Sequence, residues 1–485
     1  MNHSEPYQQP VPTLRWWLPG TALVLTVLLV GCGTAPTREE VTPVLPAGFS
    51  DTGEEAAAEK WWHDLDDPQL DRLMEEALTG NLSLSAAHAR LNQAEATARR
   101  EGSDRIPDLD ATASAERERI DSQDATESYT VGLAASYEVD LWGRVRAEHD
   151  AAALDAEASR ADLRAAAITL SAQVARTWYS RVEARARLDL LDEQLHTARQ
   201  NLELVERRFR TGHAPAADRH RQRRTIEGLE GERARAAARL ATIDHELAVL
   251  LGQPATDYQA PEGELPEPAA LPATGLPAEL IQQRPDIQAH FHRLQAADAR
   301  TAAAVANRFP RLNLTAALTS PAASTGDLMS TWVTTLGADL ALPLFDGGGR
   351  RAEVERSRAA TDEAVLDYAE AVLEAVAEVE DALVRERHQR VYLTRLEAQV
   401  AEAEELLDLT RRRYRHGDAD HLAVLDAEEG LLDARGLLLE ARREALEYRI
   451  DLHRALAGGW RGMTDAPADP LAALSGPGDA SDTED

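Results

Sequence analysis

The sequence predicts a mainly α-helical protein with a transmembrane β-barrel contribution, in which a β-strand pair and a long α-helical hairpin occur twice. Three observations predict this fold class. Alanine and leucine dominate a hydrophobic content of 44%, whereas aromatic residues account for 5%, and this composition favours long helices. Residues 145–210 contain neither proline nor glycine and would form a helix about 100 Å long at 1.5 Å per residue. Finally, stretches of the first half recur in the second half at a nearly constant spacing.

The N-terminus predicts a lipoprotein signal peptide over residues 1–31. Its apolar run, TALVLTVLLV at 21–30, is shorter than the stretch of about 20 residues that a membrane-spanning helix needs. The run leads into LVGC, which resembles a bacterial lipobox, so we expect Cys32 to be lipidated and residues 32–60 to form the lipidated N-terminal segment. Cys32 is the only cysteine, which excludes a disulfide within one chain. An ordinary signal peptide with an incidental cysteine is the alternative, and Gly33 in place of an aspartate favours the outer membrane.

An internal repeat organises the rest of the chain. LSAAHARLNQAEATARR (84–100) and IQAHFHRLQAADARTAA (287–303) match at an offset of 203, and the offset becomes 205 further on. Proline-rich sequence separates the two copies, and acidic Pro/Gly/Ala-rich sequence follows the second copy. The predicted organisation is therefore a first repeat at 61–252, a Pro-rich linker at 253–276, a second repeat at 277–460 and a disordered acidic tail at 461–485.

Alternating residues predict two strands in each repeat. From Tyr129 to Leu141 the odd positions are apolar and the even positions are polar or small, and the segment from Trp332 to Leu344 alternates in the same way. Segments of about ten residues with this pattern suit tilted transmembrane strands with one face toward lipid. A half-buried sheet of a soluble protein fits the same pattern. The expected strands lie at about 108–118, 128–141, 311–320 and 331–345.

A long helical hairpin is expected after each strand pair, over 145–251 and 350–457. Heptad positions from Leu188 to Phe209 recur 205 positions later as apolar residues or threonine, so the helical period and the repeat are in register. These patterns predict an antiparallel pair of helices in each repeat.

The two hairpins are interrupted in the same way, by FRTGHAP at 209–215 and YRHGDAD at 414–420. Gly212 and Gly417 end the long helices, because glycine after a helix adopts positive φ without steric cost. The two glycines therefore predict the turns of the two hairpins.

Four strands are too few for a closed barrel, and an open sheet edge in lipid would leave backbone groups without hydrogen bonds. If the strands span a membrane, several copies of the chain must complete one barrel together. A dimer would supply eight strands and a trimer twelve, and the strand pattern does not choose between them.

Short motifs are distributed along nearly the whole mature chain. They are WWHDLDDPQLDRL (61–73), YEVDLWGRVR (137–146), RPDI (284–287), FPRLNL (309–314), LPLFDGGGRR (342–351), EVEDAL (378–383) and ALAGGW (455–460). In these motifs and in their order, the chain resembles the outer-membrane factors (TolC-like proteins) of tripartite efflux systems, in their lipoprotein branch.

The resemblance implies a homotrimeric channel-tunnel, in which a twelve-strand outer-membrane barrel continues into a periplasmic barrel of helices. It implies a passive exit duct that receives substrates from an inner-membrane pump of the RND type through a periplasmic adaptor protein. We expect the adaptor to meet the hairpin tips at Gly212 and Gly417. Two alternatives stay open, an exit duct for protein or peptide secretion and a non-conducting coiled-coil scaffold lipoprotein.

The resemblance also implies a periplasmic gate. Asp426 matches a position of an aspartate ring, and Tyr414 and Asp218 match a pair that links neighbouring hairpins in the closed state. Ala423 stands where some relatives carry a second acid, and Ala419 stands where some carry a basic residue. The resemblance therefore leaves open whether the gate has one or two acidic rings and how strong the link is. Simpler roles are an acid near the start of a helix for Asp426 and a residue of the heptad seam for Tyr414.

Composition and motifs predict no enzyme, no cofactor, no metal and no nucleic-acid partner. Acidic residues outnumber basic ones 84 to 52, and the formal charge of −32 repels nucleic acid. DGGGRR at 346–351 lacks the GK[ST] of a phosphate-binding loop, and WWHDLDD lacks partner ligands on a second element. We find neither HExxH nor CxxC, nor a set of nucleophile, base and orienting residue.

Overall fold

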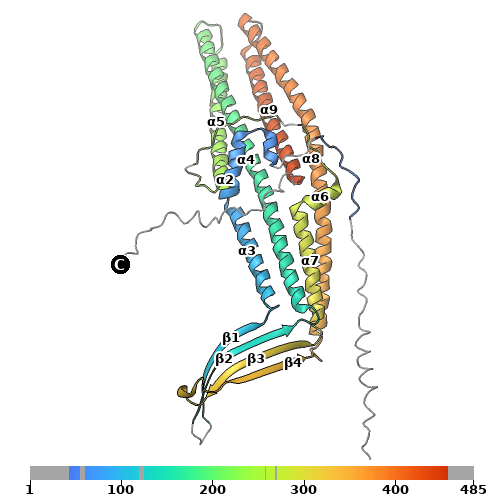
Figure 1. The fold of residues 1–485 in the computed structure, drawn as a ribbon. Helices are drawn as coiled ribbons and strands as arrows, with labels where there is room; N and C mark the ends of the chain where they lie inside the picture. Colours follow the sequence, from blue (N-terminus) through green and yellow to red (C-terminus); the bar gives the residue numbers. More distant parts are fainter. Residues whose placement is uncertain (1–42, 55–59, 120–124, 257, 268–269, 457–485) are drawn as a thin grey trace, which may run out of the picture. The chain divides into compact units, whose positions relative to one another are not determined.

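The structure of the protein is a computed structural model (Figure 1). The predicted signal peptide, Cys32 and the acidic tail at 461–485 lie outside the described residues. The described residues are 43–54, 60–119, 125–256, 258–267 and 270–456.

The two repeats contain the same order of elements, with helices, then two strands, then a helical hairpin. The first repeat comprises η1 (Trp61–Leu65), α2 (Pro68–Gly80), α3 (Leu82–Ser103), β1 (Asp108–Glu118), β2 (Thr126–Val139), α4 (Arg144–Arg210) and α5 (Ala216–Leu250). The second comprises α6 (Pro277–Gln283), α7 (Pro285–Ala306), β3 (Arg311–Ala322), η2 (Thr325–Asp327), β4 (Val333–Ala341), α8 (Gly349–His416) and α9 (His421–Ala455).

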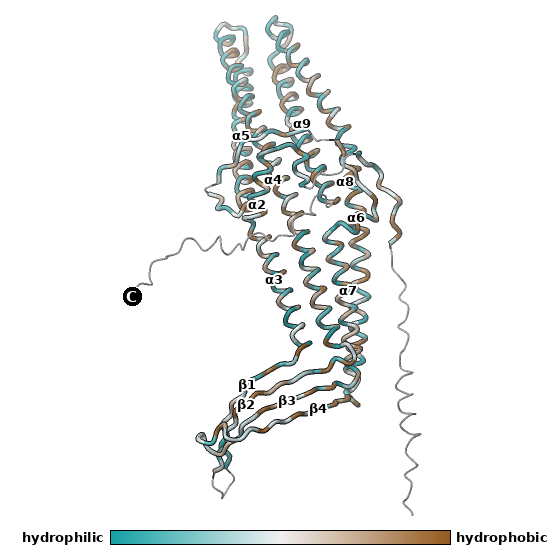
Figure 2. Tube along the Cα trace, in the orientation of Figure 1, coloured by the Kyte–Doolittle hydropathy of each residue, from teal (hydrophilic) through white to brown (hydrophobic). Residues whose placement is uncertain are grey.

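The four strands form one antiparallel sheet in the order β1-β2-β3-β4. Its register collects the apolar residues of all four strands on one face, because Leu109 pairs with Ala135, Ala135 with Ala316, and Ala316 with Leu336. Residues of the other face are mainly polar or small, and the alternation can be followed along the strands in Figure 2. Leu109 is 69% exposed and Leu336 is 79% exposed, so the apolar face of this single chain is uncovered.

The last strand is shorter than the sequence pattern predicts. β4 ends at Ala341, whereas the expected strand extends to about residue 345 and the alternation continues to Leu344. Pro343 has no N–H group for a sheet hydrogen bond, which is a physical reason for the strand to stop. Apolar alternation therefore extends past the hydrogen-bonded strand.

An aspartate lies between β2 and α4, and another lies between β4 and α8. Asp140 accepts hydrogen bonds from the backbone N–H groups of Val145 (3.1 Å) and Arg146 (2.9 Å), at the start of α4. Asp346 accepts from the N–H groups of Gly348 (3.0 Å) and Arg350 (3.1 Å), at the start of α8. The DGGGRR segment is thus a strand-to-helix junction in which a carboxylate of the chain occupies the N–H groups.

The main core lies halfway along α4. Trp61 and Trp178 are fully buried there, together with residues of α2, α3, α5 and α9. Asp67, from the WWHDLDD motif, caps α2 by accepting from Leu70 N (3.2 Å) and also accepts from Trp178 Nε1 (2.7 Å). This motif therefore anchors the N-terminal helices to the middle of the long helix.

The RPDI motif holds the second repeat together. The buried guanidinium of Arg284 is ion-paired to Asp286 and to Glu378 of α8 (2.8 Å), and donates to the carbonyl of Ala455 at the end of α9 (3.1 Å). Pro285 starts α7, where its missing N–H group costs nothing. One motif thus connects α6, α7, α8 and α9.

The helical hairpins lie next to each other. α4 packs against α5 and α9, and α8 packs against α9 (Figure 1), so the four helices run side by side in the order α5, α4, α9, α8. Among the described residues, no helix combines the length and the apolar composition that crossing a bilayer requires.

Candidate functional site

The two hairpin turns have the same geometry. Gly212 and Gly417 have φ angles of +76° and +86°. In each turn the residue after the glycine donates its N–H group to a carbonyl five residues earlier, from His213 to Arg208 (2.8 Å) and from Asp418 to Arg413 (2.9 Å). A Cβ atom at either glycine would meet no atom within 4 Å, so it is the positive φ angle that favours glycine here.

Tyr414 lies buried in the last turn of α8, between the two hairpins. The Arg208 guanidinium of α4 lies 4.4 Å from the centre of its ring, and Arg208 Nη2 donates to the Tyr414 carbonyl oxygen (3.5 Å). The ring centres of Tyr414 and His421 are 5.6 Å apart. The Tyr414 hydroxyl is buried and has no hydrogen-bond partner among the described residues.

Asp218 and Asp426 lie in different environments. Asp218 is buried in the first turn of α5, where it accepts a hydrogen bond from Arg221 Nη1 (3.0 Å). Asp426 is exposed on α9 and makes neither a hydrogen bond nor an ion pair with any described residue. Tyr414 and Asp218 thus lie at the same end of the hairpins, without a hydrogen bond between them, and Asp426 points its charge into solvent.

A buried histidine joins the two hairpins at this end. His421, the first residue of α9, lies 3.0 Å from Gln222 of α5, measured from Nε2 to Oε1. Gln222 Nε2 donates to the Ala198 carbonyl of α4 (2.9 Å), so Oε1 is the acceptor and His421 Nε2 is the donor. His421 Nδ1 is buried without a partner among the described residues. This arrangement places a proton on Nε2, and a second proton on Nδ1 would be buried without an acceptor.

The environment of His421 favours the same neutral form. Burial lowers the pKa of His421 below its ordinary value of 6.5, and the positive charge of Arg221 acts in the same direction. Three carboxylates oppose this shift without reversing it, those of Asp218, Glu428 and Asp420.

A second polar contact connects the hairpins about two helical turns further along α9. Glu428 is 8% exposed, and its Oε1 accepts from Asn201 Nδ2 of α4 (2.7 Å) and from Arg411 Nη2 of α8 (2.8 Å). Because a buried carboxylate needs such partners, Glu428 fixes α4, α8 and α9 relative to one another.

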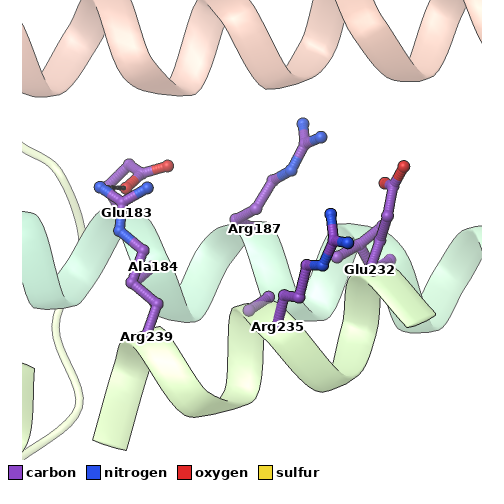
Figure 3. A pocket seen from close by; sticks show the side chains of 8 residues that line it. Glu183, Ala184, Arg187, Glu232, Arg235 and Arg239 are labelled. Carbon is purple, nitrogen blue, oxygen red and sulfur yellow. Dashed lines mark ion pairs between the residues drawn. The ribbon is translucent and has the colours of Figure 1, made fainter. Parts of the chain in front are cut away.

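A cavity of about 240 Å³ lies further along the first hairpin, between α4 and α5 (Figure 3). Arg239 is ion-paired there to the buried Glu183 (3.3 Å), whereas Arg187 and Arg235 make no ion pair with any described residue. Figure 3 shows Arg187 extending from α4 away from α5. Its guanidinium lies against Gly436 of α9, where an added Cβ atom would be 1.7 Å from Arg187 Nη1.

Comparisons with known proteins identify the family. The family described as "Outer membrane efflux protein" matches residues 73–253 and 276–458. The chain belongs to this family. The pyoverdine export outer membrane protein OpmQ of Pseudomonas aeruginosa is 32% identical to it over 475 residues, covering 91% of this chain and 97% of OpmQ. Outer membrane protein OprJ of the same organism is 33% identical over 463 residues, covering 91% of this chain and 95% of OprJ.

A solved structure agrees with this membership. The outer-membrane channel OprN matches the fold with a TM-score of 0.81 at 28% sequence identity, covering 88% of this chain and 100% of that chain. The chain is therefore an efflux protein of the outer membrane, and the prediction of its family from sequence motifs is confirmed.

In this efflux protein, Tyr414 and Asp218 lie near the turns of the hairpins, and the sequence analysis did not name the two residues that connect the hairpins there. His421 and Gln222 have alanines as their repeat counterparts, Ala216 and Ala427, each 205 positions away. A polar residue in one repeat opposite alanine in the other marks a place where the two hairpins differ. That difference is the sequence signal for this contact.

Proposed function

We propose that the chain is the outer-membrane channel of a tripartite efflux system. In this proposal a homotrimer forms the passive exit duct, a periplasmic adaptor docks on the hairpin tips, and an inner-membrane pump of the RND type supplies the substrate. Family membership supports the proposal, because the relatives compared above are named for export through, or location in, the outer membrane.

The uncovered apolar face of the four-stranded sheet carries the proposal. Leu336 and Leu340 of β4 are 79% and 68% exposed, and exposed apolar surface of this kind indicates contact with lipid or with another protein. β1 and β4 are edge strands of the sheet, and edges inside a bilayer must be paired. Three copies would join β1 to β4 around a ring of twelve strands. A coiled-coil scaffold would need no such sheet.

The gate of this channel is proposed at the hairpin tips. Tyr414 carries a buried hydroxyl without a partner, and Asp218 carries a carboxylate oriented by Arg221. Contact between Tyr414 and Asp218 of neighbouring hairpins would close the tip, and Asp426 of each copy would contribute to a ring of negative charge. Adaptor docking at Gly212 and Gly417 completes the proposal.

Ion conductance tests the function. Full-length protein in planar bilayers should carry a small current, and Tyr414→Phe combined with Asp218→Asn should raise it severalfold by removing the closing contact. Arg223→Gln, an exposed change on the same helix as Asp218, serves as the matched control and should leave the current unchanged. Absence of current from both the native protein and the double variant, at normal abundance in membranes, would contradict a channel.

Lipidation at Cys32 is a separate proposal, supported by the LVGC motif and by the absence of any other cysteine. The intact mass of membrane-extracted protein should show loss of residues 1–31 and the addition of acyl chains. Cys32→Ser should abolish both changes. Recovery of native protein with an unmodified Cys32 thiol would exclude the proposal.

A further inference from the structure

The two repeats contact each other within one chain, and the duplication suggests that two copies of the chain contact each other in an equivalent way. Within the chain, the first hairpin meets the second through α4 and α9. The opposite flanks belong to α5 and α8, the outer members of the row of four helices (Figure 1). In the duplication, α8 corresponds to α4, and α9 corresponds to α5. A contact between α8 and the α5 of a second copy would therefore use the residues that lie 205 positions away from those of the α4–α9 contact, the internal seam.

A side chain that rests on a glycine defines the internal seam. Arg187 of α4 reaches α9 at Gly436 and occupies the space that a Cβ atom would need there. The residues 205 positions away are Tyr392 on α8 and Gly231 on α5. Tyr392 is 45% exposed, and a Cβ atom at Gly231 would meet nothing within 4 Å. Tyr392 on α8 and Gly231 on α5 could therefore make, between two copies, the kind of contact that Arg187 and Gly436 make within one chain.

Charge supports the same alignment. Leu190 of α4 and Leu432 of α9 belong to one buried cluster at the internal seam. Their counterparts 205 positions away are Arg395 on α8 and Glu227 on α5, which carry opposite charges. Both are exposed, and neither makes an ion pair with any described residue. The positions of the apolar pair Leu190 and Leu432 thus correspond to oppositely charged residues on the two outer helices, α8 and α5.

The alignment has a limit toward the sheet. The internal ion pair of Arg176 and Asp451 would transpose to Asp381 and Glu246, which have the same charge. The inferred seam is therefore confined to the part of the hairpins between Tyr392 and the tip.

We propose that Tyr392 of one copy packs onto Gly231 of a second copy, with Arg395 of the first opposite Glu227 of the second. The proposal rests on the homotrimer of the proposed function and adds to it the register of the helices. A ring would then alternate two related seams, α4–α9 within each copy and α8–α5 between copies.

Cysteine cross-linking in the full-length protein tests the register. Tyr392→Cys with Gly231→Cys should give covalent dimers and trimers in oxidised membranes, because a disulfide needs Cα atoms within about 7 Å. The same pair within one chain is separated by three helix spacings of about 8–10 Å each, which excludes an internal bridge. The matched control, Tyr392→Cys with Ala238→Cys, moves one partner about 10 Å along α5. We expect at least tenfold less cross-linking in the control, with native protein as the background for Cys32.

Equal or greater cross-linking in the shifted control, or none in either variant, would overturn the proposed register. Native mass separates this failure from failure of the function. A trimer without the Tyr392–Gly231 cross-link leaves the channel intact and rejects the register, whereas a monomer rejects both.

Charge exchange gives an independent test that needs no cysteine. Glu227→Arg should lower the temperature at which the oligomer dissociates in detergent, and the added Arg395→Glu should restore it. Failure of the second change to restore the oligomer, with both single variants folded, would contradict the pairing of these two residues.

Discussion

At the scale of single residues, the hairpin tip contains a histidine whose uncharged form the fold favours. His421 donates through Nε2 to Gln222, and its Nδ1 is buried without a partner among the described residues. Protonation would place a second N–H group, and a charge, in a buried site. Tyr414 packs against the same ring, so the state of His421 bears directly on the proposed gate.

Acidification should therefore loosen the tip. Burial depresses the pKa of His421, so its stabilising contribution is complete above the unfolded value of 6.5 and is lost as the pH falls from there toward the folded pKa. The loss should approach about 1.4 kcal/mol per pH unit within that window. Hydrogen exchange of the amides of residues 421–428, corrected for intrinsic rates, should report it between pH 7 and pH 5.

His421→Gln provides the decisive variant, because its amide can donate to Gln222 and does not titrate. It should remove most of the pH dependence of exchange at the tip. His416→Gln, at an exposed histidine of the same tip, should retain it. The opposite sign, with stronger protection at pH 5, would mean that Asp218, Glu428 and Asp420 outweigh burial.

For single residues, the sequence predicts where along a hairpin a residue lies better than it predicts which residue of the other hairpin it contacts. The resemblance assigns Tyr414 and Asp218 to the gate, and the two residues lie in the last turn of α8 and the first turn of α5. The contact of His421 with Gln222 joins residues 199 positions apart, and it depends on how one hairpin is set against the other. Neither heptad spacing nor composition specifies how the two hairpins are aligned against each other.

At the scale of elements, glycine determines how the hairpins turn. Both Gly212 and Gly417 have positive φ angles, and neither is crowded. Replacing both with leucine should cost about 1–2 kcal/mol per site, because a Cβ atom disfavours this backbone conformation. The sheet is formed by residues about 100 Å away along the helices and should be unaffected.

The affinity for the adaptor, measured with purified components, should fall in the Gly212→Leu/Gly417→Leu variant together with export. Gly212→Asn/Gly417→Asn is the matched control, since asparagine tolerates positive φ, and should bind more tightly than the leucine variant. Normal assembly with unchanged adaptor affinity in the leucine variant would reduce the glycines to helix stops and remove their docking role.

The elements also show how far a periodic pattern can be followed. Period two predicts four strands and freedom from proline and glycine predicts the long helix of the first hairpin, and the structure has β1 to β4 and α4 in these parts of the chain. The end of β4 differs from the prediction, because apolar alternation runs on through Pro343 although the hydrogen-bonded ladder stops at Ala341. Alternation records which face a side chain occupies, whereas a strand end depends on backbone N–H groups.

At the scale of the whole molecule, duplication explains both the fold and its incompleteness. The two repeats pair β2 with β3 and α4 with α9, which leaves β1, β4, α5 and α8 at the free edges. The sequence predicts this incompleteness from the strand count, but the number of copies that complete the ring is implied by family resemblance. The number of copies depends on how strongly the sheet and the helices curve in the assembled ring, which the strand count does not specify.

The native mass of full-length protein extracted in mild detergent decides whether copies of this chain complete one another in an outer-membrane channel. We expect one dominant species with the mass of three lipidated chains, and that species should conduct ions when transferred to a bilayer. A stable species with the mass of one chain that conducts equally well would contradict it, because a single four-stranded sheet would then have to span the membrane with its edges unpaired.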